Sequence, residues 1–176
     1  ARATNAIPAG VTNQVSLFLK PEEQTALPLP GTELPFTVQV ARLDVPGTAI
    51  TQQVHYVMPE LHGLRIAAEP ETLYTSPNGS LPLDLAVLNI GNVTQDVQIT
   101  LTLPANFTAT APPTPLRLAP GETSTQTVTV TALSAPVDQD SDGAFAVRYG
   151  PTNNLEKRVE LLLHVAAPGS LQALSA

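Results

Sequence analysis

Apolar and polar residues alternate along much of this chain with the period of about two residues that is typical of β-strands. In residues 125–131, for example, Val128 and Val130 fall on one face and threonines fall on the other. β-Branched hydroxyl side chains suit the exposed side of a strand whose other side is buried. The same pattern predicts strands at residues 81–87, 97–103, 125–131, 145–149 and 159–165, with shorter ones near Leu73 and Leu116.

Turn-forming residues separate the predicted strands. Clusters of Pro, Gly and Asn lie at residues 89–92, 112–115, 119–121 and 151–154. Pro120 presets one turn dihedral and Gly121 permits a positive φ at the next position, as a type II turn requires, and Pro30 and Gly31 repeat this pair. This spacing predicts an all-β fold in which residues from about Glu69 to Pro168 form one complete antiparallel sandwich of roughly seven strands.

The chain also contains an internal repeat. Residues 10–19 match residues 92–101, and residues 29–33 match residues 119–123. A repeat of about 80 to 90 residues has the length of a small β-domain rather than of a solenoid unit. We therefore expect tandem immunoglobulin-like antiparallel β-sandwiches. The predicted division is a partial repeat over residues 1–68, a complete repeat over residues 69–168, and a tail or linker over residues 169–176.

The N-terminal copy is incomplete, because nothing in it corresponds to residues 73–91. Its strands are predicted at residues 15–19, 34–40, 50–56 and 61–67. Two explanations are open: the segment was cut or processed inside a longer array, or the missing strands come from another chain by swapping or donation. In either case so small a core needs cover, so we expect a homodimer through this copy or close packing against the second copy. A stiff joint is expected at Glu69-Pro70-Glu71, which has no Gly/Ser-rich linker.

Composition narrows the range of functions. The 176 residues are 43% apolar and include 18 prolines, no Cys and no Trp, with a net charge of -7. These values indicate a globular chain, and the few scattered basic residues argue against binding to nucleic acid or to an anionic membrane. There is no apolar run long enough to span a membrane and no signal peptide at the start, so we expect a mature or excised piece of a longer protein.

Three motifs carry a resemblance to a known family. They are an Asn-x-Gly that ends one strand, a Leu-Pro after the next, and a Leu-x-Pro-Gly-Glu turn, found at residues 89–91, 103–104 and 118–122. With their flanking strands they resemble the bacterial immunoglobulin-like domains of the NPCBM-associated type and the related CARDB adhesion domains. The resemblance covers residues from about Glu69 to Val165 well and from Val11 to Ala67 in part. It implies a secreted or surface-attached multidomain protein, although Asp142-Gly-Ala-Phe145 departs from the usual small-Gly-x-Tyr.

No catalytic arrangement is evident in the sequence. Gly-x-Ser-x-Gly, His-Glu-x-x-His, a phosphate loop and a Cys nucleophile are all missing. His164 is expected on the exposed side of a strand. His55 and His62 flank a predicted turn and could approach one another, but no third ligand lies at metal-binding spacing. We therefore expect that the chain is not an enzyme.

One chemical signal remains, the acidic run Asp138-Gln-Asp-Ser-Asp-Gly143. Alternate carboxylates followed by a glycine at the sixth place form the first half of a calcium loop. The second half is missing, since Tyr149 stands where a bidentate Glu is required. One interpretation is a polar hairpin tip. The other is a weak calcium site made by Asp138, Asp140, Asp142 and the carbonyl of Ala144, completed by waters.

These observations favour a non-enzymatic module that spaces or presents neighbouring domains on a secreted or cell-surface protein. The alternative is an accessory binding or adhesion module for carbohydrate or a protein partner. Sugar sites usually need exposed aromatic platforms, and the tyrosines are only Tyr56, Tyr74 and Tyr149. Because Tyr56 and Tyr149 are in register with inward-facing valines, the sequence favours the spacer.

Overall fold

The computed structural model describes residues 27–41, 47, 49–110, 112, 115–133 and 137–166. These residues form eleven β-strands and no helix, which confirms the predicted all-β class. The strands are β1 (Glu33–Ala41), β2 (Ala49–Val57), β3 (Leu64–Glu69), β4 (Thr72–Thr75), β5 (Ser80–Asn89), β6 (Gln95–Thr102), β7 (Phe107–Ala109), β8 (Leu116–Leu118), β9 (Thr123–Ala132), β10 (Gln139–Tyr149) and β11 (Leu155–Val165).

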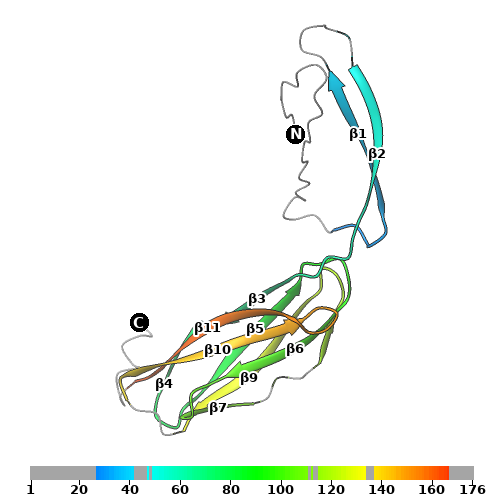
Figure 1. Ribbon diagram of the computed structural model, residues 1–176. Helices are drawn as coiled ribbons and strands as arrows, with labels where there is room; N and C mark the ends of the chain where they lie inside the picture. Colours follow the sequence, from blue (N-terminus) through cyan, green and yellow to red (C-terminus); the bar gives the residue numbers. More distant parts are fainter. Residues whose placement is uncertain are drawn as a thin grey trace.

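Most of the strands build a sandwich of two facing sheets (Figure 1). One sheet has five strands in the order β4-β11-β10-β6-β8, and the other has four strands in the order β3-β5-β9-β7. Neighbouring strands are antiparallel except for β4 and β11, which run parallel. Because consecutive strands such as β5 and β6 lie in different sheets, the chain crosses repeatedly between the layers, as immunoglobulin-like sandwiches do.

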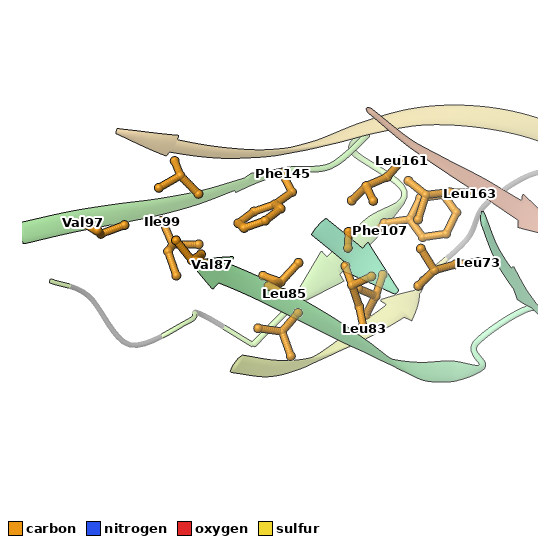
Figure 2. Packing of buried hydrophobic residues seen from close by; sticks show 14 of the residues in the cluster. Leu73, Leu83, Leu85, Val87, Val97, Ile99, Phe107, Phe145, Leu161 and Leu163 are labelled. Carbon is orange, nitrogen blue, oxygen red and sulfur yellow. The ribbon is translucent and has the colours of Figure 1, made fainter. Parts of the chain in front are cut away.

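The hydrophobic core lies between the two sheets and is largely aliphatic (Figure 2). Leu83, Leu85 and Val87 occupy alternate positions of β5 and are 0% exposed. Figure 2 shows them in the core together with Phe145 of β10 and Leu163 of β11, which come from the opposite sheet and are equally buried. Burial of one such side chain contributes about 1.5–3 kcal/mol, so this core is the main source of stability.

Strands β1 and β2 form a separate hairpin that projects from one end of the sandwich (Figure 1). The register pairs Glu33 with Val57 near the sandwich and Ala41 with Ala49 at the far end. One face of the hairpin, called here the apolar hairpin face, consists of Leu34, Phe36, Val38, Val40, Ile50, Val54 and Tyr56, interrupted by Gln52. Val40 is 62% exposed and Ile50 is 77% exposed, so the far end of this face is open to solvent.

The strand assigned above to the end of the N-terminal copy belongs instead to the sandwich. Residues 64–69 form β3, which pairs with β5, so the assignment of residues 61–67 to the first copy is wrong. The physical reason is that Leu64 and Ala68, 2% and 4% exposed, complete the sandwich core. The segment Glu69-Pro70-Glu71 therefore connects β3 to β4 inside the sandwich, and the joint between the two regions lies elsewhere.

The internal repeat is visible in the turns but not in the strand pairing. Gly31 and Gly121 adopt φ values of 80° and 76°, which confirms the positive φ predicted for both Pro-Gly turns. However, β1 pairs with the strand that follows it, whereas β9 and the strand that follows it, β10, lie in different sheets. The strand predicted at residues 15–19 and the tail at residues 169–176 lie outside the described residues, so these two parts of the domain division stay predictions.

Candidate functional site at the hairpin joint

The hairpin meets the sandwich at a joint made of three segments. The chain enters β1 through residues 27–32 and leaves β2 through residues 58–63, and both segments lie against the loop of residues 90–94 between β5 and β6. At the base of the hairpin, Gly31 N donates to Met58 O at 2.8 Å and Met58 N donates to Thr32 O at 2.9 Å. Residues 58–63 are called here the exit segment. Asn92 N donates to Leu61 O at 3.0 Å, which fastens the exit segment to the sandwich.

Asn92 is the centre of this joint, and its side chain is 1% exposed. Its Nδ2 donates to Pro28 O at 3.0 Å and to Pro59 O at 2.9 Å. Its Oδ1 accepts from Leu61 N at 2.7 Å. Because Pro28 precedes the hairpin and Pro59 follows it, one amide group ties both ends of the hairpin to the sandwich.

Asn89 and Gly91 shape the loop that presents Asn92. The Asn89 side chain is fully buried, and its Nδ2 donates to Val93 O at 2.8 Å and to Leu118 O at 3.0 Å. Its Oδ1 accepts from Gly91 N at 2.9 Å. A Cβ atom on Gly91 would lie 2.3 Å from Leu61 O, so only glycine allows the exit segment to approach the loop this closely. The Asn-x-Gly at the end of the strand is therefore part of the joint.

A second buried amide, Gln95, extends the polar network. Gly150 N donates to Gln95 Oε1 at 3.3 Å, which orients the amide so that Nε2 donates to His62 Nδ1 at 2.8 Å. His62 Nε2 lies 3.8 Å from Glu60 Oε2. Among the described residues, no buried side-chain nitrogen or oxygen lacks a hydrogen-bond partner. The joint is thus a satisfied polar network, which is the condition for buried polar groups to rigidify a structure.

The structure gives the three histidines separate surroundings. His55 Nδ1 lies 3.5 Å from Glu33 Oε2 on the hairpin, while His62 faces Gln95 in the joint. His164, predicted as a simple exposed residue, is half-buried and contacts Asp140 and Tyr74. Over the described part of the chain, no group of three or more His, Cys, Asp or Glu side chains is arranged to hold a metal ion.

The acidic run lies mostly on a strand rather than in a closed loop. Asp138 has a φ of 57° and its N donates to Val165 O at 2.7 Å, while Asp140 and Asp142 are exposed on β10. In a strand, alternate residues are about 6.8 Å apart, so these carboxylates do not converge as in a calcium loop. Ala144 is buried further along β10. Calcium binding by these residues stays a prediction.

Packing accounts for the glycine of the acidic run. A Cβ atom on Gly143 would lie 3.1 Å from Leu163 Cδ1 and 3.2 Å from the backbone oxygen of Thr102. Both contacts are tighter than is usual for a Cβ atom, and one is to backbone, so a larger residue would disturb the core. The glycine therefore has a structural role on the inner side of β10.

The tyrosines are placed only partly as expected. Tyr149 is 5% exposed, which confirms its inward position. Tyr56 was predicted to face inward with Val54, but it is 38% exposed because it lies on the apolar hairpin face. Tyr74, on the edge strand β4, is 48% exposed.

Comparisons with known proteins give matches only among solved structures. No family model matches the chain, and no curated protein sequence matches it. The periplasmic chaperone SfaE is 18% identical with a TM-score of 0.40, over 57% of each chain. The E. coli chaperone DraB is 22% identical with a TM-score of 0.41, over 60% of this chain and 56% of DraB. Domains 4 and 5 of the S-layer protein SbsC are 19% identical with a TM-score of 0.38, over 70% of this chain and 67% of that one.

These TM-scores are all below 0.5, and the matches do not distinguish the NPCBM-associated or CARDB type. The chain spans less than two thirds of the length of either chaperone. None of the described segments forms a helix with the length and apolar character needed to cross a membrane.

Proposed function

We propose that this chain is a non-enzymatic spacer module of a secreted or cell-surface multidomain protein, and that its joint holds the hairpin in one orientation on the sandwich. Asn92 carries the proposal. Its two N–H donors and its oxygen are all occupied in a buried site, by groups on both sides of the hairpin. A hinge motion at the base would leave these groups unpaired, and each unpaired buried group costs about 1–3 kcal/mol. The joint should therefore resist bending.

The side-chain chemistry also favours a structural role. The polar groups of the joint form hydrogen bonds with one another and with backbone atoms. These hydrogen bonds stabilise the fold and are not directed at a ligand. Two ion pairs lie on the surface. They are Arg148 with Glu156, at 2.9 Å, and Arg158 with Glu160, at 2.7 Å. Such pairs contribute about 0–1 kcal/mol each and are not an arrangement for acid–base chemistry.

The partner we propose for the apolar hairpin face is a neighbouring domain of the same longer protein. An isolated two-stranded hairpin is at best marginally stable in water, so burial of this uncharged face would stabilise it. A second copy of the chain is the rival occupant. Sedimentation velocity over a wide concentration range distinguishes them, because a homodimer through this face would dissociate on dilution and would be disrupted by Ile50→Lys.

The stiffness of the joint can be measured with spin labels, because the chain contains no Cys and engineered cysteines are unique. Labels at Gln53 on β2 and Thr125 on β9, both exposed, report the distance between hairpin and sandwich by pulsed electron spin resonance. We expect a narrow distance distribution in the parent protein and a broad one in Asn92→Ala. Asn154→Ala removes an exposed amide in the turn between β10 and β11 and is the matched control, expected to resemble the parent.

Two outcomes would contradict the proposal. A broad distribution in the parent protein would mean that the chain is a flexible tether. A narrow one in Asn92→Ala would mean that the amide does not set the orientation. Hydrogen exchange of β5 and β10 amides verifies that the sandwich itself stays folded in the variant.

A further inference from the structure

Strand β4 lies beside β11 at the end of the sandwich away from the hairpin (Figure 1). On the outer face of the five-stranded sheet at this end, three side chains form a row. Tyr74 on β4 is in register with His164 on β11, which is in register with Asp140 on β10. The Tyr74 and His164 ring centroids are 5.5 Å apart with planes inclined at 55°, and His164 Nδ1 lies 2.7 Å from Asp140 Oδ1. The next residues on the inner side, Leu73 and Leu163, are in the core. The row is thus preformed on well-packed strands.

The chemistry of this row suits a neutral, hydroxyl-rich ligand. Tyr74 is 48% exposed and offers an aromatic ring for stacking against C–H groups. The second oxygen of Asp140 and the exposed carboxylate of Asp142, which lies in the adjacent row, can accept hydrogen bonds from hydroxyls. Because Asp140 engages His164 at Nδ1, the histidine keeps Nε2 for a further hydrogen bond.

We propose that this row, with Asp142 beside it, binds a pyranose sugar whose hydroxyl groups are equatorial, such as a β-linked glucosyl unit. Equatorial hydroxyls leave the faces of the sugar ring apolar, so one face can stack on Tyr74 while hydroxyls at the rim donate to Asp140 and Asp142. The carboxylates disfavour an anionic sugar. The row is also too small for a protein partner, since stable protein interfaces use about 20–30 residues a side. This inference goes beyond the spacer role and does not depend on it.

The test is a titration of the isotope-labelled full chain with cellotetraose, followed by backbone amide chemical shifts. One stacked ring and a few hydrogen bonds give weak binding, with a dissociation constant on the order of 1 mM. We expect saturable shifts confined to residues 72–75, 139–142 and 162–165. Their confinement to three neighbouring strands would identify the site.

Variants separate stacking from general surface effects. Tyr74→Ala is expected to weaken binding at least about tenfold, and Tyr74→Phe, which keeps the ring, is expected to stay within about twofold of the parent. Tyr56→Ala removes an exposed tyrosine from the hairpin and is the matched control, expected to bind as the parent does. Because Tyr74 is half-exposed, its loss should not unfold the sandwich, and the amide spectrum of the variant verifies this.

Several results would overturn the proposal. The absence of saturable shifts, shifts centred on other strands, or undiminished binding by Tyr74→Ala would each do so. A cation site is the rival interpretation of an aromatic ring beside carboxylates. Binding of lysine methyl ester at these residues that weakens with added salt, without a response to cellotetraose, would assign the row to an amine instead.

Discussion

The sandwich and the hairpin share one alternating pattern, yet they bury it to very different extents. Leu83 and Leu85 on β5 are 0% exposed because a second sheet covers them, whereas Val40 and Ile50 on the hairpin are 62% and 77% exposed. Alternation therefore specifies which residues share a face, and long-range packing decides whether that face is covered. Most of the free energy of unfolding should therefore come from the sandwich, whereas the orientation of the hairpin depends on the joint.

The largest expected effect tests this comparison with a matched pair of phenylalanines. Phe145 is fully buried on β10, and Phe36 is half-buried on β1. Phe145→Ala is expected to lower the free energy of unfolding by about 3–5 kcal/mol, because it removes buried surface and leaves a cavity. Phe36→Ala should cost less than about 1.5 kcal/mol. Urea denaturation measures both, and equal losses would mean that the apolar hairpin face is as well covered in solution as the core.

A smaller effect is expected at the joint from Gly91→Ala. The added Cβ would meet the backbone oxygen of Leu61 at 2.3 Å, so the exit segment must shift. Overpacking of this kind costs about 1–3 kcal/mol and should also broaden the spin-label distance. Gly121→Ala is the control, because its Cβ would meet nothing within 4 Å and the cost of about 1–2 kcal/mol comes from its positive φ. If Gly91→Ala leaves the distance unchanged, close approach at Leu61 is not what orients the hairpin.

The smallest effect concerns calcium and the acidic run. Without a twelfth-position Glu, any site at Asp138, Asp140, Asp142 and Ala144 should be weak, with a dissociation constant of about 10⁻⁴ to 10⁻³ M. Calcium at about ten times that value would add only about 1.4 kcal/mol of stability. Thermal melts in calcium and in chelator measure the shift. No shift in the parent rejects the site, and an equal shift in Asp140→Ala places the ion elsewhere.

The sequence predicted the sandwich core because burial there follows local alternation. Val128 and Val130 face inward as expected, at 1% and 3% exposure. Strand partners were harder to predict, because pairing depends on residues far apart in the chain. Residues 64–69 alternate well enough to suit either region, and only the packing of Leu64 and Ala68 beside β5 assigns them to the sandwich.

The joint could not be predicted for the same reason. The sequence indicates Asn92 only as a member of a turn cluster. Its side-chain amide donates to the carbonyls of Pro28 and Pro59, which are 64 and 33 positions away in the chain. The acidic run was ambiguous because a spacing of about two residues between carboxylates fits both a calcium loop and the outer face of a strand. In the structure Asp140 and Asp142 lie on the outer face of β10. Close packing against Leu163 explains why residue 143 is a glycine.

The parallel pairing of β4 and β11 determines how the sandwich would carry tension. A pull on the chain before β4 and after β11 draws these strands in opposite directions, so their hydrogen bonds are loaded in shear rather than peeled apart one by one. The bonds from Leu162 N to Glu71 O, at 3.0 Å, and from Ala166 N to Thr75 O, at 2.8 Å, bracket the paired segment. Bonds loaded together must break together, which slows unfolding under force, the quantity that governs mechanical lifetime.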